Sequence, residues 1–175
     1  KYNFDIYKLY NLKETLIEIN NIIGLNNVKK KITELIIYYL QNLETNFKNK
    51  LHTVITGPPG SGKTMLTKYL AKIFFKLEII KTNKVIIARR SDLIGKYLGQ
   101  TAPKTQGMIN KALGGVLLID EVYQLGNSEG RDSYSKECID TINQNLTEHQ
   151  GEFICVVAGY KKDVENCFFS VNAGL

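Results

Sequence analysis

The sequence predicts a three-layer α/β fold, in which a parallel β-sheet carries helices on both faces. Short apolar or β-branched runs alternate with longer amphipathic segments, an order that favours right-handed crossovers between parallel strands. The run VLLI at residues 116–119 has no polar alternation, as expected of a strand buried on both faces. A glycine-rich motif at residues 57–64 separates the first apolar run from the helical pattern that follows it. Together these three observations favour a doubly covered parallel sheet with a ligand-binding loop.

Composition indicates one compact domain. The chain has 175 residues, 43% of them hydrophobic and 23% charged, which is enough for a substantial core. We see no apolar run long enough to span a membrane and no signal-peptide pattern, although a sequence starting at Lys1 is expected to lack the native N-terminus. Three scattered cysteines without C-x-x-C spacing favour free thiols. We therefore expect a cytoplasmic protein, or one from an organelle with a reducing interior.

The charge balance permits a nucleic-acid partner but does not argue for one. The formal net charge is +6, and the basic residues are scattered apart from residues 29–31 and 89–90. The three lysines at 29–31 are interpreted as the solvated side of a helix. His52 and His149 are isolated, so structural or surface roles are favoured over metal ligation.

The N-terminal region is expected to be helical. Residues 12–23 predict a short helix ending at Gly24, and Asn27 is a candidate N-cap for the next one. We divide the chain into an N-terminal helical segment and linker, residues 1–27, and an α/β nucleotide-binding subdomain, residues 28–175. The second helix has apolar side chains at 3.6-residue spacing: Val28, Ile32, Leu35, Ile36, Tyr39 and Leu40.

The remaining elements follow from the same patterns. Strands are expected where β-branched or apolar runs lie between turn signals, and helices where the apolar period is 3.6. The expected strands are residues 51–56, 84–88, 116–119 and 153–158, and the expected helices are residues 63–75, 91–99 (short and broken by glycines), 101–113 and 132–148.

The motif GPPGSGKT at residues 57–64 fits the phosphate-binding pattern G-x-x-x-x-G-K-[ST] at every fixed position. Its glycines let the backbone N–H groups turn inward as an anion nest, and the following helix adds its positive N-terminal end. Lys63 supplies a charge for the β- and γ-phosphates of ATP, and the Thr64 hydroxyl suits Mg²⁺. A plain glycine-rich turn is the alternative, but the strand and helix patterns on either side favour the phosphate site. The expected nucleotide contacts are Pro59, Gly60, Ser61, Gly62, Lys63, Thr64 and Met65.

Asp120 and Glu121 follow directly after the buried run at residues 116–119. At the C-terminal end of a central parallel strand, two acids lie beside the phosphate loop, where open α/β sheets bind ligands. We expect Asp120 to hold Mg²⁺, largely through water, and Glu121 to orient or deprotonate the water that attacks the γ-phosphate. Two acids capping a turn are the alternative, but the complete motif upstream favours an ATPase site with Lys63 and Glu121 as catalytic residues.

With these residues in view, the chain resembles the AAA+ ATPases, and most of all the branch of the red-type Rubisco activases and the stage V sporulation protein K-like ATPases. The resemblance spans roughly residues 20–175. It rests on IGL at 23–25, the GPPGSGKT motif, DLIGKYLGQTAPKT at 92–105, GGVLLIDE at 114–121 and AGYK at 158–161.

The resemblance implies further roles. Ile23, Gly24 and Leu25 would contact adenine, and Tyr97, Leu98 and Gly99 would form a loop lining the central pore of a homohexamer. There an aromatic side chain on a flexible glycine mount would grip a polypeptide client, whose identity stays open. A tyrosine covering the local core is the alternative for Tyr97. A nucleotide-switched binding module without threading, or a nucleic-acid-acting ATPase, are the alternative functions.

The chain also departs from the family pattern. Many AAA+ proteins have an Asn at the end of the last strand here, where this chain has Gly159 or Tyr160, so Tyr160 is only a weak candidate for orienting water. The family's arginine finger, fifth strand and helical lid would lie beyond Leu175, and nothing in its sequence marks Arg131 as the finger. We therefore expect residues 51–56 at a sheet edge, poor assembly and slow hydrolysis by residues 1–175 alone.

Overall fold

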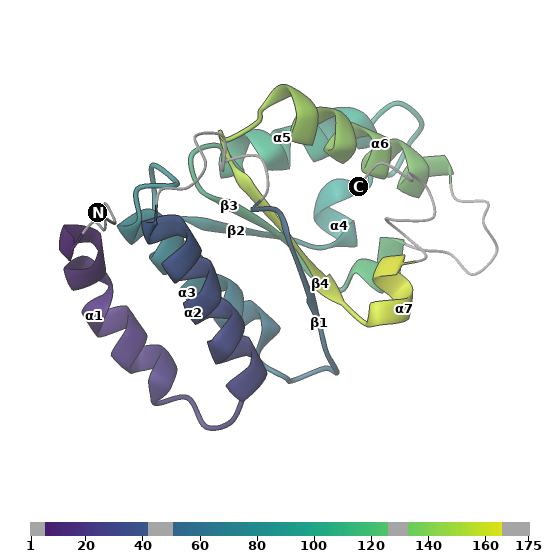
Figure 1. Ribbon diagram of the computed structural model, residues 1–175. Coiled ribbons are helices and arrows are strands. Elements are labelled where there is room, and N and C mark those ends of the chain that lie inside the picture. The colour runs from purple at the N-terminus through teal and green to yellow at the C-terminus, as the bar shows by residue number, and fades with distance from the viewer. Residues whose placement is uncertain (1–5, 42–50, 126–132, 166–175) are drawn as a thin grey trace.

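The computed structural model describes residues 6–41, 51–125 and 133–165, and Figure 1 shows the arrangement of their elements. Helices and strands alternate along most of the chain. In order they are α1 (Ile6–Asn20), α2 (Asn26–Leu40), β1 (Thr53–Thr56), α3 (Lys63–Lys76), β2 (Val85–Ala88), α4 (Arg90–Leu93), α5 (Thr101–Ala112), β3 (Val116–Ile119), the 3₁₀ helix η2 (Val122–Leu125), α6 (Ser133–Glu148), β4 (Ile154–Gly159) and α7 (Lys161–Val164).

The strands form a parallel sheet in the order β1-β4-β3-β2. In its register Thr56 pairs with Gly159, and Ala88 pairs with Ile119. The C-terminal ends of the strands therefore meet at one edge of the sheet, which is where parallel sheets bind ligands. Within the described part of the chain β1 lies at the border of the sheet, as the sequence predicted for residues 51–56.

Two separate apolar cores, one on each face of the sheet, confirm the three-layer fold. Along β3, Val116 and Leu118 enter the core formed with α1, α2 and α3, whereas Leu117 and Ile119 enter the core formed with α4, α5 and α6. All four side chains are fully buried, so the strand has no polar face to show in its sequence. Figure 1 shows the two helical layers on opposite sides of the sheet.

The N-terminal helices differ from the sequence prediction. Helix α1 begins at Ile6 and ends at Asn20, whereas the sequence predicted a helix over residues 12–23. Its buried residues are Leu12, Thr15 and Ile19, and several large apolar side chains face outward, so the apolar positions do not show a clear helical period. Helix α2 begins at Asn26, so Asn27 lies in its first turn and is not the N-cap.

The lysine run at 29–31 is also not simply a solvated face. The Lys29 ammonium donates hydrogen bonds to the carbonyl oxygens of Asn20 and Ile22, which joins α2 to the end of α1.

Some predicted features lie wholly or mostly outside the described residues: the expected loop at residues 124–131, Arg131 and Cys167. No described helix is long and apolar enough to cross a membrane.

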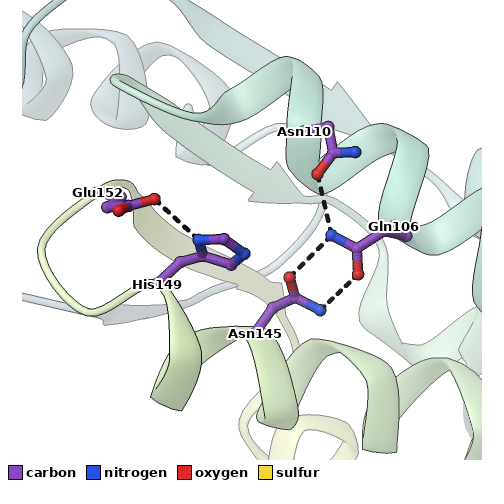
Figure 2. Close-up of polar contacts among 5 residues, drawn as sticks. All are labelled: Gln106, Asn110, Asn145, His149 and Glu152. Atoms are coloured by element: carbon purple, nitrogen blue, oxygen red, sulfur yellow. Dashed lines mark hydrogen bonds and ion pairs between the residues drawn. The ribbon is translucent and has the colours of Figure 1, made fainter.

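Polar side chains join α5 to α6, as Figure 2 shows. The amides of Gln106 and Asn145 form a reciprocal pair, with Nε2–Oδ1 and Oε1–Nδ2 distances of 2.9 and 2.8 Å. Gln106 Nε2 also donates to Asn110 Oδ1, and the buried Asn145 donates to the carbonyl oxygen of Thr141. A buried amide needs such partners, so this contact holds the two helices in a fixed register.

Candidate nucleotide-binding site

The phosphate motif forms the connection between β1 and the N-terminus of α3. Gly60 and Gly62 have φ angles of 72° and 83°, in the left-handed region that side-chain-bearing residues avoid. Gly62 immediately precedes Lys63, the first residue of α3, so the loop ends where the helix presents its free N–H groups. Gly57 N–H donates to the carbonyl oxygen of Gly159 at 3.2 Å, which anchors the loop to the end of β4. This arrangement suits an anionic ligand.

Lys63 lies against the backbone of the same loop. Its ammonium donates to the carbonyl oxygens of Gly57 and Pro58 at 3.0 and 2.9 Å. The positive charge is therefore held beside the nest of loop amides, within reach of a phosphate chain bound there.

Thr64 and Asp120 come together from α3 and from the end of β3. The Thr64 hydroxyl donates to Asp120 Oδ2 at 3.2 Å, and Asp120 Oδ1 accepts the Glu121 N–H at 3.0 Å. A hydroxyl beside a carboxylate offers the hard oxygen ligands that Mg²⁺ prefers. The donor set therefore fits this ion, and it joins residues 56 positions apart in the chain.

Glu121 has a left-handed backbone conformation, with φ of 56°. Such a conformation costs a side-chain-bearing residue on the order of 1 to 3 kcal/mol, and strain of this kind concentrates at functional sites. The turn allows the chain to leave β3 and enter η2 while Glu121 stays at the cavity wall. No sequence pattern had indicated this strain.

A cavity of about 670 Å³ brings most of the predicted nucleotide-binding residues together. Ser61, a predicted contact in the motif, does not line the cavity; its N–H donates to the Pro58 carbonyl oxygen at 3.3 Å and closes the loop. A larger cavity of about 880 Å³, between α1 and the C-terminal end of α3, contains none of the predicted residues. We assign the site to the smaller cavity because its chemistry suits phosphate and metal. Its walls are Pro59, Gly60, Gly62, Lys63, Thr64, Met65, Asp120, Glu121, Gly159 and Tyr160.

The end of β4 explains why a glycine occupies position 159. A Cβ on Gly159 would lie 2.6 Å from Val122 Cγ1 and 3.4 Å from Val164 Cγ2, because η2 and α7 pack directly against the strand. Position 159 therefore has no room for a polar side chain such as that of Asn. Tyr160, at the N-cap of α7, is half-exposed and lines the cavity, so its water-orienting role stays a prediction.

The predicted adenine contacts do not line this cavity. Ile23 is 98% exposed, and Gly24 and Leu25 both have positive φ in the turn between α1 and α2. The first turn of α2 nevertheless shares a groove of about 430 Å³ with Thr56 and Leu66, so the turn lies near the end of β1. Adenine contact by residues 23–25 remains a prediction.

The Tyr97 loop, residues 95–100, lies between α4 and α5 and contributes nothing to the cavity wall. Tyr97 and Leu98 are 70% and 82% exposed, so Tyr97 does not cover the local core. Gly99 has φ of 77°, whereas Gly95 is needed for close approach: its Cβ would lie 2.5 Å from Gln100 Cβ and 2.8 Å from Gln100 C. The sequence predicted that the flanking glycines make the loop flexible, but at Gly95 the two ends of the loop pack closely together.

Sequence comparison identifies the family. A model of the ATPase family associated with various cellular activities (AAA) matches residues 53–166. The chain belongs to this AAA family. The matched residues include the phosphate loop, Asp120, Glu121 and the Tyr97 loop. Membership of this ATPase family implies that the chain binds a nucleotide.

Curated relatives place this AAA chain within the family. It is 47% identical over 173 residues to the putative cfxQ-like protein R730 of Acanthamoeba polyphaga mimivirus, covering 99% of this chain and 43% of that protein. Identity is 37% over 171 residues to stage V sporulation protein K of Bacillus subtilis strain 168, covering 94% and 52%. It is 35% over 176 residues to the chloroplastic ribulose bisphosphate carboxylase/oxygenase activase of Cyanidioschyzon merolae strain NIES-3377 / 10D, covering 97% and 60%. The chain thus spans about half the length of these relatives.

A solved structure confirms the fold. The FIGL-1 AAA domain in complex with ADP superimposes with a TM-score of 0.51 at 20% identity, covering 86% of this chain and 56% of that one. Identity this low supports the shared fold alone.

Proposed function

We propose that the chain binds ATP in the 670 Å³ cavity and hydrolyses its γ-phosphate. The observation that carries this proposal is the approach of Thr64 Oγ1 to Asp120 Oδ2 at 3.2 Å, beside the glycine nest and Glu121. Anion-binding amides, hard oxygen ligands and a carboxylate for water then line one cavity, which is what phosphoryl transfer to water requires.

Each residue has a defined part in the proposed reaction. The loop amides and Lys63 bind and orient the β- and γ-phosphates, while Thr64 and Asp120 hold Mg²⁺. The ion, when bound, supplies charge neutralisation on the phosphate oxygens. Glu121 accepts a proton from the attacking water. The water oxygen bonds to the γ-phosphorus while the bond between that phosphorus and the bridging oxygen of ADP breaks. Positioning and electrostatics carry most of such a barrier, and a placed base adds about 10²–10⁴ in rate.

Two substitutions separate binding from hydrolysis. Lys63→Ala should abolish ATP binding in calorimetry, while Lys68→Ala, an exposed lysine further along α3, should leave binding unchanged. Glu121→Gln should retain ATP but hydrolyse it at least about 100-fold more slowly, since the neutral amide is not a base. Wild-type affinity in Lys63→Ala would remove the phosphate-loop assignment, and wild-type turnover in Glu121→Gln would remove the base.

We further propose that the chain works in a hexameric ring that pulls on a polypeptide through the Tyr97 loop. The exposure of Tyr97 and Leu98, and a relative named for activating ribulose bisphosphate carboxylase/oxygenase, support this proposal. An aromatic side chain offers a large apolar contact with little sequence preference.

Fluorescein-labelled casein, a loosely folded polypeptide, provides a general test in the intact protein. Casein should stimulate ATP turnover, and Tyr97→Ala should lose the stimulation while Tyr97→Phe keeps it. Sedimentation with ATP should show six protomers. Stimulation that survives Tyr97→Ala would refute threading through this loop and favour a nucleotide-switched binding module. Stimulation by DNA or RNA would instead favour a nucleic-acid-acting ATPase.

A further inference from the structure

The N-terminus of α5 is capped by a side chain from another helix. Its N-cap residue, Gln100, makes no side-chain capping hydrogen bond. Instead the Ala102 N–H donates to Glu137 Oε1, in α6, at 3.2 Å. A carboxylate here satisfies one of the free N–H groups of the first turn and interacts favourably with the helix dipole. Glu137 in α6 thus caps the N-terminus of α5, a role that a residue next to the helix start in the sequence usually has.

This cap lies at the base of the Tyr97 loop. Gly95 N–H donates to Thr101 Oγ1 at 3.2 Å, so the start of the loop is joined to the first residue of α5. Thr105 Oγ1 donates to the Leu93 carbonyl oxygen, and the Lys104 ammonium donates to that of Ile94. The N-terminal side of the loop is therefore joined to α5 by hydrogen bonds, and its C-terminal end continues directly into that helix.

Helix α6 connects this unit to the strand edge that carries Asp120. Arg90 Nη1 donates to Ser135 Oγ at 2.9 Å, two residues before Glu137 in α6. Arg90 itself lies two residues after Ala88, whose carbonyl oxygen accepts the Asp120 N–H at 3.0 Å. Hydrogen bonds and short backbone segments therefore lead from the backbone of Asp120 through Arg90 and α6 to the base of the loop, and the amide pair between α5 and α6 (Figure 2) joins the same two helices a second time.

We propose that Glu137 is a positioning residue that fixes the Tyr97 loop to α6, so that nucleotide binding beside Asp120 changes the surroundings of Tyr97. This inference rests on the proposed nucleotide site and goes beyond it by assigning the residue that couples the site to the loop. The test therefore measures the response of the loop itself.

Residues 1–175 contain no tryptophan, so Tyr97→Trp in this chain places a single indole fluorophore in the loop. In this parent variant the emission and anisotropy of the indole are recorded with and without a non-hydrolysable ATP analogue. Nucleotide affinity is measured separately with a mant-labelled nucleotide. The substitutions added to the parent are Glu137→Ala, Glu137→Gln and the control Glu148→Ala, an exposed glutamate at the far end of α6.

Glu137→Ala should bind nucleotide within twofold of the parent affinity, lose more than half of the indole response and lower its anisotropy. Glu137→Gln retains an acceptor oxygen and should recover most of the response, and Glu148→Ala should equal the parent. Should Glu137→Ala fail to fold by circular dichroism, Glu137→Asp, which keeps the charge but shortens the side chain, replaces it with the same expected loss.

A full indole response in Glu137→Ala, or no response in a parent that binds nucleotide, overturns the inference and leaves the ATP site standing. Failure of the parent to bind the mant-labelled nucleotide overturns the proposed ATP site, and the inference with it.

Discussion

Gly95→Ala tests the closed base of the Tyr97 loop. The added Cβ would lie 2.5 Å from Gln100 Cβ, 2.8 Å from Gln100 C and 3.0 Å from Thr101 N. The last two are backbone atoms, so no rotamer change relieves the contact and the loop has to open. Gly95 N–H would then move away from the oxygen of the fully buried Thr101.

The expected cost follows from these two effects. Overpacking costs about 1 to 3 kcal/mol, and the hydrogen bond contributes about 0.5 to 1.5 kcal/mol. Loop opening relieves part of the first, so we expect about 1 to 4 kcal/mol in all. At about 2 to 4 °C per kcal/mol for a domain of this size, Tm should fall by about 2 to 16 °C.

Gly107→Ala provides the matched control. Gly107 lies inside α5, and a Cβ there would meet nothing within 4 Å. Replacing a mid-helix glycine by alanine should stabilise the protein by about 0.5 to 1 kcal/mol. Both variants are compared with the wild type by thermal unfolding and by nucleotide affinity, which should stay within about twofold. A Gly95→Ala protein that unfolds within about 1 °C of the wild type would refute the argument.

Two further predictions concern buried titratable groups. Burial lowers the pKa of His52 below its usual 6.5, and its Nδ1 accepts the Cys155 N–H, so the unfolded state binds more protons below about pH 6.5. Stability to urea should therefore fall as the pH is lowered from about 7.5 to 5.5, and His52→Gln should make stability less dependent on pH in this range. An equal pH dependence in the variant and the wild type would contradict the lowered pKa of His52. Burial raises the pKa of the Cys138 thiol to about 11 and that of Cys155 to about 12. In a Cys167→Ser background both thiols should resist Ellman's reagent at about pH 8 until urea unfolds the protein, and rapid labelling of the folded protein would be inconsistent with their burial.

Sequence patterns were most informative where a backbone conformation or complete burial restricts which residue types can occupy a position. Positive φ at Gly60 and Gly62 is a requirement that few other residues meet, so the phosphate loop was recognisable. The continuous apolar run of β3 identified a strand buried on both faces, and the acids after it were placed correctly at its end. Helix α1 was misplaced because its outward face carries Ile6, Tyr7 and Tyr10, which mask the buried stripe.

Local patterns by themselves determined the four strands, most of the helices and most of the residues that line the 670 Å³ cavity, because backbone conformation and burial leave periodic and compositional traces. Only the tertiary structure decided the contacts between distant positions: Glu137 with Ala102, His52 with Cys155 and the missing space at Gly159 beside Val122. These depend on how two finished elements approach each other. That approach is set by the packing of both cores at once, and no stretch of sequence records it.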